Sequence, residues 1–139
     1  MVDSKKIAKV AKFRKAERDR LTLLVAKLQR ELQNVENFVV QLERYASDYS
    51  HNRNTVASKG ISSDSLQALD SFGARLRATV DVQKSSTGVI SDRLNQQKKL
   101  LSLAAEKLRR LERVLEESRR AEARLADRVN TLEYLDQVK

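Results

Sequence analysis

The chain has 139 residues, contains no proline, cysteine or tryptophan and only 3 glycines, and 34% of its residues are charged. This composition is typical of long helices with polar outer faces, and the absence of cysteine excludes disulfides and thiolate metal sites. The net charge of +9 favours acidic partners or nucleic acid, while no apolar run approaches the ~20 residues of a membrane-spanning helix.

Residues 4 to about 58 are predicted to form the first of two long helices, with Ser4 as its N-cap. Apolar residues recur at alternating spacings of three and four, the pattern of a helix with one buried stripe. In a heptad frame the a positions are Ile7, Arg14, Leu21, Leu28, Val35, Leu42, Tyr49 and Val56, and the d positions are Val10, Glu17, Leu24, Glu31, Phe38, Tyr45 and Asn52. The stripe is widened by the e positions Val25, Leu32, Val39 and Ala46. We expect the a and d positions to face a partner helix, since this is the usual coiled-coil seam.

The polar stretch at residues 50–65 interrupts the apolar pattern, and within it we place the reversal of the chain at residues 59–62. Gly60 suits the position just past a helix end, where a left-handed backbone costs glycine least. Ser62 or Ser63 can accept hydrogen bonds from the first amides of a following helix, and Asp64 suits its first turn. These caps predict a short connection between two helices.

The second predicted helix runs from residue 63 to about 135 and carries the longest heptad pattern. Its a positions are Leu66, Gly73, Val80, Thr87, Leu94, Leu101, Leu108, Leu115, Glu122 and Val129. Its d positions are Leu69, Leu76, Gln83, Ile90, Gln97, Ala104, Leu111, Ser118, Leu125 and Leu132. A seam that persists over so many heptads indicates a coiled coil rather than a helix of a globular core.

A short connection lets two helices fold back antiparallel, so that each stripe is covered within the same chain. The sequence therefore predicts an all-α fold, in which two long helices form an antiparallel coiled-coil hairpin and the second helix is longer. Residues 1–139 are expected to form a single coiled-coil domain and a monomer, in which residue i faces roughly residue 121 − i. The second helix should then overhang the first after about Leu115. A self-associating parallel dimer is the alternative, and the break at residues 60–64 disfavours it.

The sequence offers nothing that indicates catalysis or a cofactor. The single histidine, His51, lies near the predicted turn and far from any cluster of functional groups. Carboxylates alternate with basic residues at helical spacing, as in Glu106/Arg110 and Glu116/Arg120, which supports a helix surface. Neither a phosphate-binding loop nor a dinucleotide-binding glycine motif is present. We therefore expect a protein that is not an enzyme and needs no metal or cofactor.

Basic residues gather near both ends of the sequence. Residues 1–30 carry a net charge of +7 and residues 98–128 carry +4, whereas the middle is nearly neutral. Because both chain ends lie at the open end of an antiparallel hairpin, the two basic blocks should come together. Acidic residues are interleaved, and Phe13 is the only aromatic residue in either block. A solvated face or an acidic protein partner is therefore favoured over nucleic acid, which needs stacking aromatics or a uniformly basic helix.

An apolar pair, Phe72 and Leu76, is expected on the helix surface near the turn. The two residues lie one helical turn apart, so they either staple the helix or present an apolar surface to a partner. Tyr45 and Tyr49 should lie across the hairpin and pack beneath this surface.

The residues that surround the turn resemble a known family. The resemblance is carried by the chain length, the two-helix layout and the pattern formed by Leu42, Tyr45, Tyr49, Gly60, Ile61, Phe72 and Leu76. In these features the chain resembles the FliJ family of flagellar export proteins, which belongs with the YscO-type stalks of injectisome type III secretion. The resemblance implies an antiparallel coiled coil similar to the central stalk of rotary F-type ATPases.

The same resemblance implies a function in bacterial flagellum biogenesis. It implies a non-enzymatic stalk whose terminal end sits in the hexameric export ATPase FliI. The stalk stimulates this ATPase and also contacts the cytoplasmic domain of the export gate protein FlhA. The gate contact maps onto Phe72 and Leu76. For the ATPase ring, the basic open end supplies the candidates Lys9, Lys12, Arg14, Lys15, Arg18, Arg109, Arg110, Arg113, Arg119, Arg120 and Arg124.

The expected location is the cytoplasm, because the first residues lack the apolar core of a secretory signal. There the resemblance places the protein peripherally, at the export apparatus of the inner membrane. The alternatives are an export chaperone or escort protein, with export chaperones among its partners, and a generic coiled-coil scaffold or nucleic-acid binder.

Overall fold

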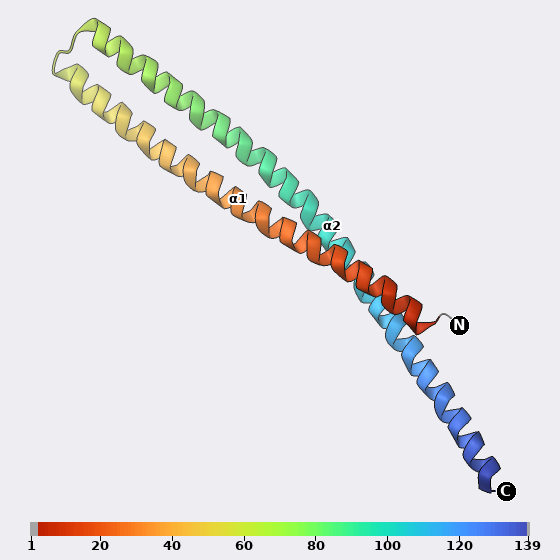
Figure 1. The fold of residues 1–139 in the computed structure, drawn as a ribbon. Helices are drawn as coiled ribbons and strands as arrows, with labels where there is room; N and C mark the ends of the chain where they lie inside the picture. Colours follow the sequence, from red (N-terminus) through yellow and green to blue (C-terminus); the bar gives the residue numbers. More distant parts are fainter. Residues whose placement is uncertain (1–2, 139) are drawn as a thin grey trace. The chain divides into compact units, whose positions relative to one another are not determined.

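The computed structural model describes residues 3–138, and these form two α-helices that fold into an antiparallel coiled-coil hairpin (Figure 1). Helix α1 comprises Ser4–Ser58, 55 residues, and α2 comprises Ser63–Val138, 76 residues. No strand occurs between residues 3 and 138. The predicted all-α hairpin with a longer second helix is therefore confirmed.

The four residues between the helices, 59–62, are those at which the sequence placed the reversal. Gly60 adopts φ +78°, and its amide donates to the carbonyl oxygen of Ala57 at 3.3 Å, which ends α1. Ser62 caps α2, because its Oγ accepts a hydrogen bond from the amide of Ser65 at 3.3 Å and its carbonyl oxygen accepts one from Leu66 at 3.0 Å. Asp64 lies in the first turn of α2, where its charge is favourable to the helix dipole.

Replacing Gly60 and Gly88 by alanine should change the stability of the fold in opposite directions. A side chain at the left-handed Gly60 is strained by roughly 1–2 kcal/mol. Gly88 lies within α2 with nothing within 4 Å of an added Cβ, so Gly88→Ala should stabilise the fold by about 1 kcal/mol through helix propensity. Thermal unfolding followed by circular dichroism measures both changes, and equal shifts in the two variants would contradict this account of the turn.

The hairpin divides into two compact units, each of which contains a segment of α1 and a segment of α2. The turn unit comprises Val25–Gln96, and the terminal unit pairs the segment up to Leu24 with the segment from Gln97 onward. The buried apolar residues of the terminal unit are Ile7, Ala11, Leu21, Ala104 and Leu108. Those of the turn unit are Val25, Leu28, Val39, Val80 and Leu94. Each unit therefore has a small core of its own.

The row of α1 that packs against α2 differs from the predicted a and d rows. Val25 and Val39, at e positions, are buried, whereas Phe38 and Tyr45, at d positions, are exposed. The a and e rows repeat with the same alternating spacing as a and d, so the period alone does not distinguish them. The d row also contains Glu17, Glu31 and Asn52. Turning this row outward avoids the cost of burying charged and polar groups, and the predicted seam was wrong on this point.

The N-terminus of α1 is fixed on α2 by Ser4. The backbone amide of Ser4 donates to Glu122 Oε1 at 3.0 Å, and its hydroxyl donates to Glu122 Oε2 at 2.7 Å. This carboxylate satisfies one of the first amides of α1, which have no partner within the helix. The N-cap itself is Asp3 rather than Ser4, since Asp3 Oδ1 accepts from the amide of Lys5 at 3.1 Å. The expected N-cap was therefore wrong by one residue.

The overhang of α2 begins later than predicted. Ser4 faces Glu122, whereas the relation 121 − i would place residue 117 opposite it. Ser118, Ala121 and Glu122, which should already overhang, are half-buried, and every described residue after Glu122 is exposed. The pairing is thus shifted by five residues at this end, because the carboxylate of Glu122 holds the start of α1. In Figure 1 the blue end of α2 extends past the red start of α1.

Candidate functional site

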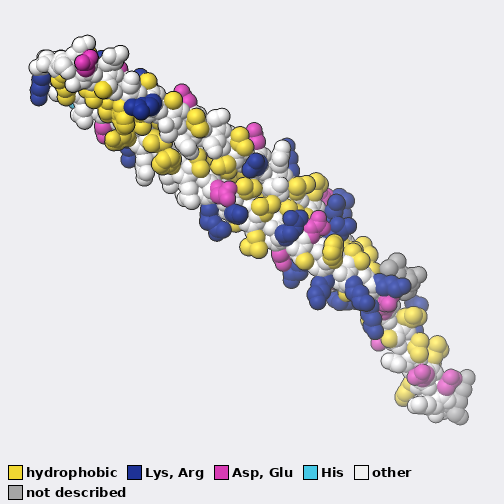
Figure 2. All heavy atoms as spheres, turned by 45° about the horizontal axis from the view of Figure 1, so that its top comes forward, with side chains coloured by type: hydrophobic (Ala, Val, Ile, Leu, Met, Phe, Trp, Pro, Cys, Tyr) yellow, Lys and Arg dark blue, Asp and Glu magenta, His cyan; other side chains and the backbone are white. Residues whose placement is uncertain are grey.

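The terminal unit contains nearly all of the excess positive charge. Its segments hold 19 Lys and Arg against 11 Asp and Glu, a net charge of +8, whereas the turn unit holds 9 against 8, a net charge of +1. On the face drawn in Figure 2, Lys and Arg side chains are interspersed with acidic ones. The two basic blocks at the ends of the sequence therefore belong to one compact unit, as expected from an antiparallel hairpin.

Most of the predicted ring-binding residues project from the surface of the terminal unit. The exposed ones are Lys9, Lys12, Lys15, Arg109, Arg110, Arg113, Arg119, Arg120 and Arg124. Two of them are engaged along α2: Arg110 pairs with Glu106 at 2.5 Å, and Arg120 pairs with Glu116 at 2.6 Å. Such exposed pairs are weak, so both arginines remain able to exchange their partner for another carboxylate.

Arg14 and Arg18 differ from the other predicted ring-binding residues because both are half-buried. They belong to the a and e rows of α1, which face α2. Arg14 Nη1 donates to Glu17 at 3.2 Å, and Arg18 Nη2 donates to Asp19 at 2.8 Å. These two arginines flank the interior of the terminal unit, and the exposed basic surface is made by the remaining residues.

In the turn unit, Phe72 lies on the surface and is held from below by Tyr49. Their ring centroids are 4.8 Å apart at an interplanar angle of 53°, a tilted arrangement that aromatic pairs favour. The hydroxyl of Tyr49 donates to the carbonyl oxygen of Leu69 at 2.7 Å, and the ring lies 3.4 Å from where a Cβ of Gly73 would be. The ring of Tyr49 thus packs beside Gly73 in the seam and against Phe72, and the packing role expected for Tyr49 is confirmed.

An apolar hollow extends from Phe72 toward the turn. Its lining comprises Tyr45, Tyr49, Val56, Ile61, Ser65, Ala68, Leu69 and Phe72. The sequence did not assign Val56 and Ile61 to this surface, although two apolar residues within the polar stretch at 50–65 are a signal that could have indicated it. Leu76 lies on the other side of Phe72, half-buried in the seam, and lines a smaller hollow with Arg75 and Thr79.

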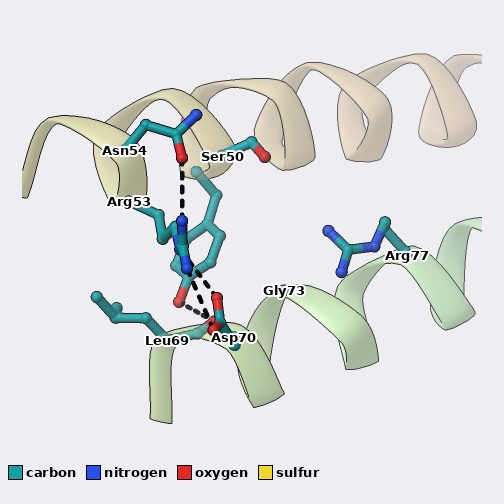
Figure 3. Close-up of a pocket in the computed structure, with 8 residues that line it drawn as sticks. Ser50, Arg53, Asn54, Leu69, Asp70, Gly73 and Arg77 are labelled. Atoms are coloured by element: carbon teal, nitrogen blue, oxygen red, sulfur yellow. Dashed lines mark hydrogen bonds and ion pairs between the residues drawn. The ribbon is translucent and has the colours of Figure 1, made fainter. Parts of the chain in front are cut away.

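On the opposite flank of Tyr49, an ion pair joins the two helices next to the turn (Figure 3). Arg53 of α1 donates to the two carboxylate oxygens of Asp70 of α2, at 2.9 Å and 3.2 Å. Figure 3 shows Arg53 between Asn54 and Asp70, while Arg77 lies farther along α2. Arg53 thus links α1 to α2 at the place where Tyr49 contacts Phe72.

A second ion pair between the helices of the turn unit joins Lys84 and Glu43 at 2.6 Å. The hydrogen bond that Lys84 donates to Glu43, together with the negative charge of that carboxylate, raises the pKa of Lys84 above its ordinary value of 10.5. A raised pKa of a cation in the folded state means that its stabilising contribution is present below pH 10.5 and is lost as the pH rises through the folded value.

The described residues contain no arrangement typical of a metal centre. Between residues 3 and 138 no group of three or more His, Asp or Glu is placed to hold an ion. Over the same residues, neither helix has an apolar stretch sufficient to cross a membrane. The candidate functional sites are therefore two surfaces, a basic one on the terminal unit and an apolar one on the turn unit.

In the comparison with protein families, the chain matches the family model described as the flagellar FliJ protein over residues 4–133. The match includes all of α1, the turn, and α2 as far as residue 133. No curated protein and no solved structure matches the chain.

Proposed function

Because the chain belongs to the FliJ family of flagellar proteins, whose model matches residues 4–133, we propose that it is a non-enzymatic coupling component of the flagellar type III export apparatus. In this proposal the terminal unit binds and stimulates the hexameric export ATPase, a FliI-like protein. The turn unit contacts the cytoplasmic domain of the export gate, a FlhA-like protein. The protein acts as a monomer in the cytoplasm, peripheral to the inner membrane through these partners.

The observation that carries the proposal is the separation of two unlike surfaces between the two units. The terminal unit has a net charge of +8 and the turn unit has +1. The apolar hollow beside Phe72 belongs to the turn unit alone. A protein that joins two partners needs two surfaces that do not compete, and surfaces of different chemistry select different partners.

The basic surface is suited to a ring that must turn over ATP while the stalk stays bound. Its exposed Lys and Arg side chains make long-range attractions that steer association and hold the stalk without a single fixed geometry. Acidic residues are interleaved on the same helices, and the i, i+4 pairs of Arg110 and Arg120 can open when a partner carboxylate approaches. Mixed charge of this kind lets successive states of the ring bias the stalk without locking it.

The ATPase activity of the purified ring, measured with and without this protein, tests the proposed role. We expect stimulation, and we expect the variant Arg109→Glu/Arg113→Glu/Arg119→Glu to lose about tenfold or more of its affinity for the ring. The matched control is Arg30→Glu/Arg44→Glu/Arg93→Glu, which makes the same change of charge on exposed residues of the turn unit and should alter affinity little. If the wild-type protein neither stimulates the ring nor co-sediments with it, the coupling role is excluded.

A further inference from the structure

Phe13 is the most exposed aromatic residue of the described chain, with 70% of its surface accessible. It lies on the outer side of α1, away from the buried row formed by Ile7, Ala11 and Leu21. Phe13 therefore adds nothing to the core of the terminal unit, and its position requires another explanation than packing within the chain.

Beside Phe13 the surface of α1 forms a shallow hollow. Its lining comprises Phe13, Arg14, Ala16, Glu17 and Arg20. Phe13 and Arg20 are seven residues apart, so they stand two helical turns apart on one face, with the short side chain of Ala16 between them. An aromatic ring and a guanidinium thus form two walls, and a methyl group forms the floor.

The charge around this hollow is positive. Lys9 and Lys6 lie on the same helical face, one turn and two turns before Phe13 respectively, and both are exposed. The one carboxylate of the lining, Glu17, is already paired with Arg14 at 3.2 Å. Of the two arginines in the lining, Arg14 is paired with Glu17, and the lining contains no second carboxylate for Arg20.

We propose that Phe13, Ala16 and Arg20 form an anchoring site for an acidic segment of the export ATPase. In this site one apolar side chain of the segment enters the space above Ala16, between the ring of Phe13 and the stem of Arg20, and a neighbouring carboxylate pairs with the guanidinium. The inference rests on the proposed function and deepens it, since neither Phe13 nor Arg20 is among the residues predicted from the sequence to bind the ATPase ring.

A protein partner fits this surface better than an anionic membrane does. A helix that lies in a membrane interface needs a broad apolar face, whereas the face of Phe13 carries Lys6, Lys9, Glu17 and Arg20 and adds only the small apolar side chains of Val10 and Ala16. An exposed aromatic residue surrounded by charged side chains is instead typical of a protein–protein interface. Aromatic residues and arginine are enriched in such interfaces, and tryptophan, tyrosine and arginine dominate their hot spots.

The experiment measures the affinity of the purified cognate export ATPase for the full-length protein and its variants. Phe13→Ala should weaken binding about tenfold or more while leaving the helical content unchanged, since the ring is exposed and alanine is the better helix former. The matched control is Leu23→Ala, which truncates a residue that is 73% exposed on the same helix but outside the hollow, and it should change affinity less than twofold. Arg20→Ala should cost less in the Phe13→Ala background than in the wild type, because both residues hold the same segment.

The outcomes separate this inference from the proposed function. If the wild type binds the ATPase and Phe13→Ala binds as tightly as Leu23→Ala, the anchoring site is wrong and the coupling role stands. If the wild type does not bind the ATPase at all, both fall. If Phe13→Ala reduces co-sedimentation with vesicles of phosphatidylglycerol but not affinity for the ATPase, the site serves a membrane and the inference is overturned.

Discussion

Replacing Leu108 by alanine should unfold the terminal unit and leave the turn unit folded. Leu108 is 2% exposed and is the one large side chain among the described residues that is fully buried. Truncation of such a leucine costs about 2–5 kcal/mol, through lost transfer free energy and the cavity that remains. The terminal unit has only five buried apolar residues, so a loss of this size is comparable to the whole stability of a small structure.

Hydrogen exchange read by mass spectrometry measures this outcome along the chain. Peptides from residues 4–24 and 97–122 should lose protection, whereas peptides from 25–96 should keep it. The matched control is Leu103→Ala, which removes the same atoms from a side chain that is 53% exposed and should change protection little. Simultaneous loss of protection in all peptides would show that the two units fold as one cooperative structure.

The same variant tests how function is divided between the units. With the terminal unit unfolded, binding to the export ATPase should be lost, because its basic residues no longer share one surface. Binding to the export gate should persist, because Phe72, Tyr49 and the hollow beside them belong to the turn unit. Loss of both activities together would contradict the proposed division.

The features of the fold that were predictable from the sequence are those set by local chemistry. The reversal at residues 59–62 depends on a glycine with positive φ and a serine cap, and both are determined by residues next to one another in the chain. The continuous a and d rows of α2 indicated a long helix with one buried stripe, and Leu94 and Leu108 are indeed buried there.

The features that could not be predicted depend on contacts between distant residues. A repeat of seven does not distinguish the a and e rows of α1 from the a and d rows, so the orientation of α1 is decided by the polar side chains that must stay outside. The start of the overhang is decided by the hydrogen bonds between Ser4 and Glu122. A loop length cannot specify that pairing, because a shift of three or four residues still places an a or d position of one helix opposite an a or d position of the other.

For the candidate surfaces as well, some features could be predicted from the sequence and others depend on contacts between distant residues. That the basic blocks would share one unit followed from the antiparallel layout alone, but the half-buried state of Arg14 and Arg18 follows from the orientation of α1. Phe72 was recognised as a surface residue, whereas the hollow beside it depends on Val56 and Ile61 at the turn, which only the folded chain brings next to Phe72.

Replacing Phe72 by alanine should reduce affinity for the cytoplasmic domain of the export gate about tenfold or more, since buried aromatic side chains dominate the energy of interfaces. The folded chain should tolerate the change. The lost ring contact with Tyr49 costs about 0.5–1.5 kcal/mol in addition to the apolar area that Phe72 no longer buries. The higher helix propensity of alanine offsets about half of a kcal/mol of this cost. Phe72 is 39% exposed, so the variant leaves no sealed cavity.

Leu76→Ala distinguishes a binding role from a structural one at the same surface, and binding and thermal unfolding should be measured side by side. Leu76 is half-buried in the seam, so its truncation should lower the melting temperature more than Phe72→Ala does. The matched control for binding is Val82→Ala, at an exposed apolar residue of α2 in the same unit. It should leave gate affinity unchanged and should not lower the melting temperature, because alanine is the better helix former. If Phe72→Ala lowers the melting temperature as much as Leu76→Ala and leaves gate affinity unchanged, Phe72 is a staple between the helices and the gate surface lies elsewhere.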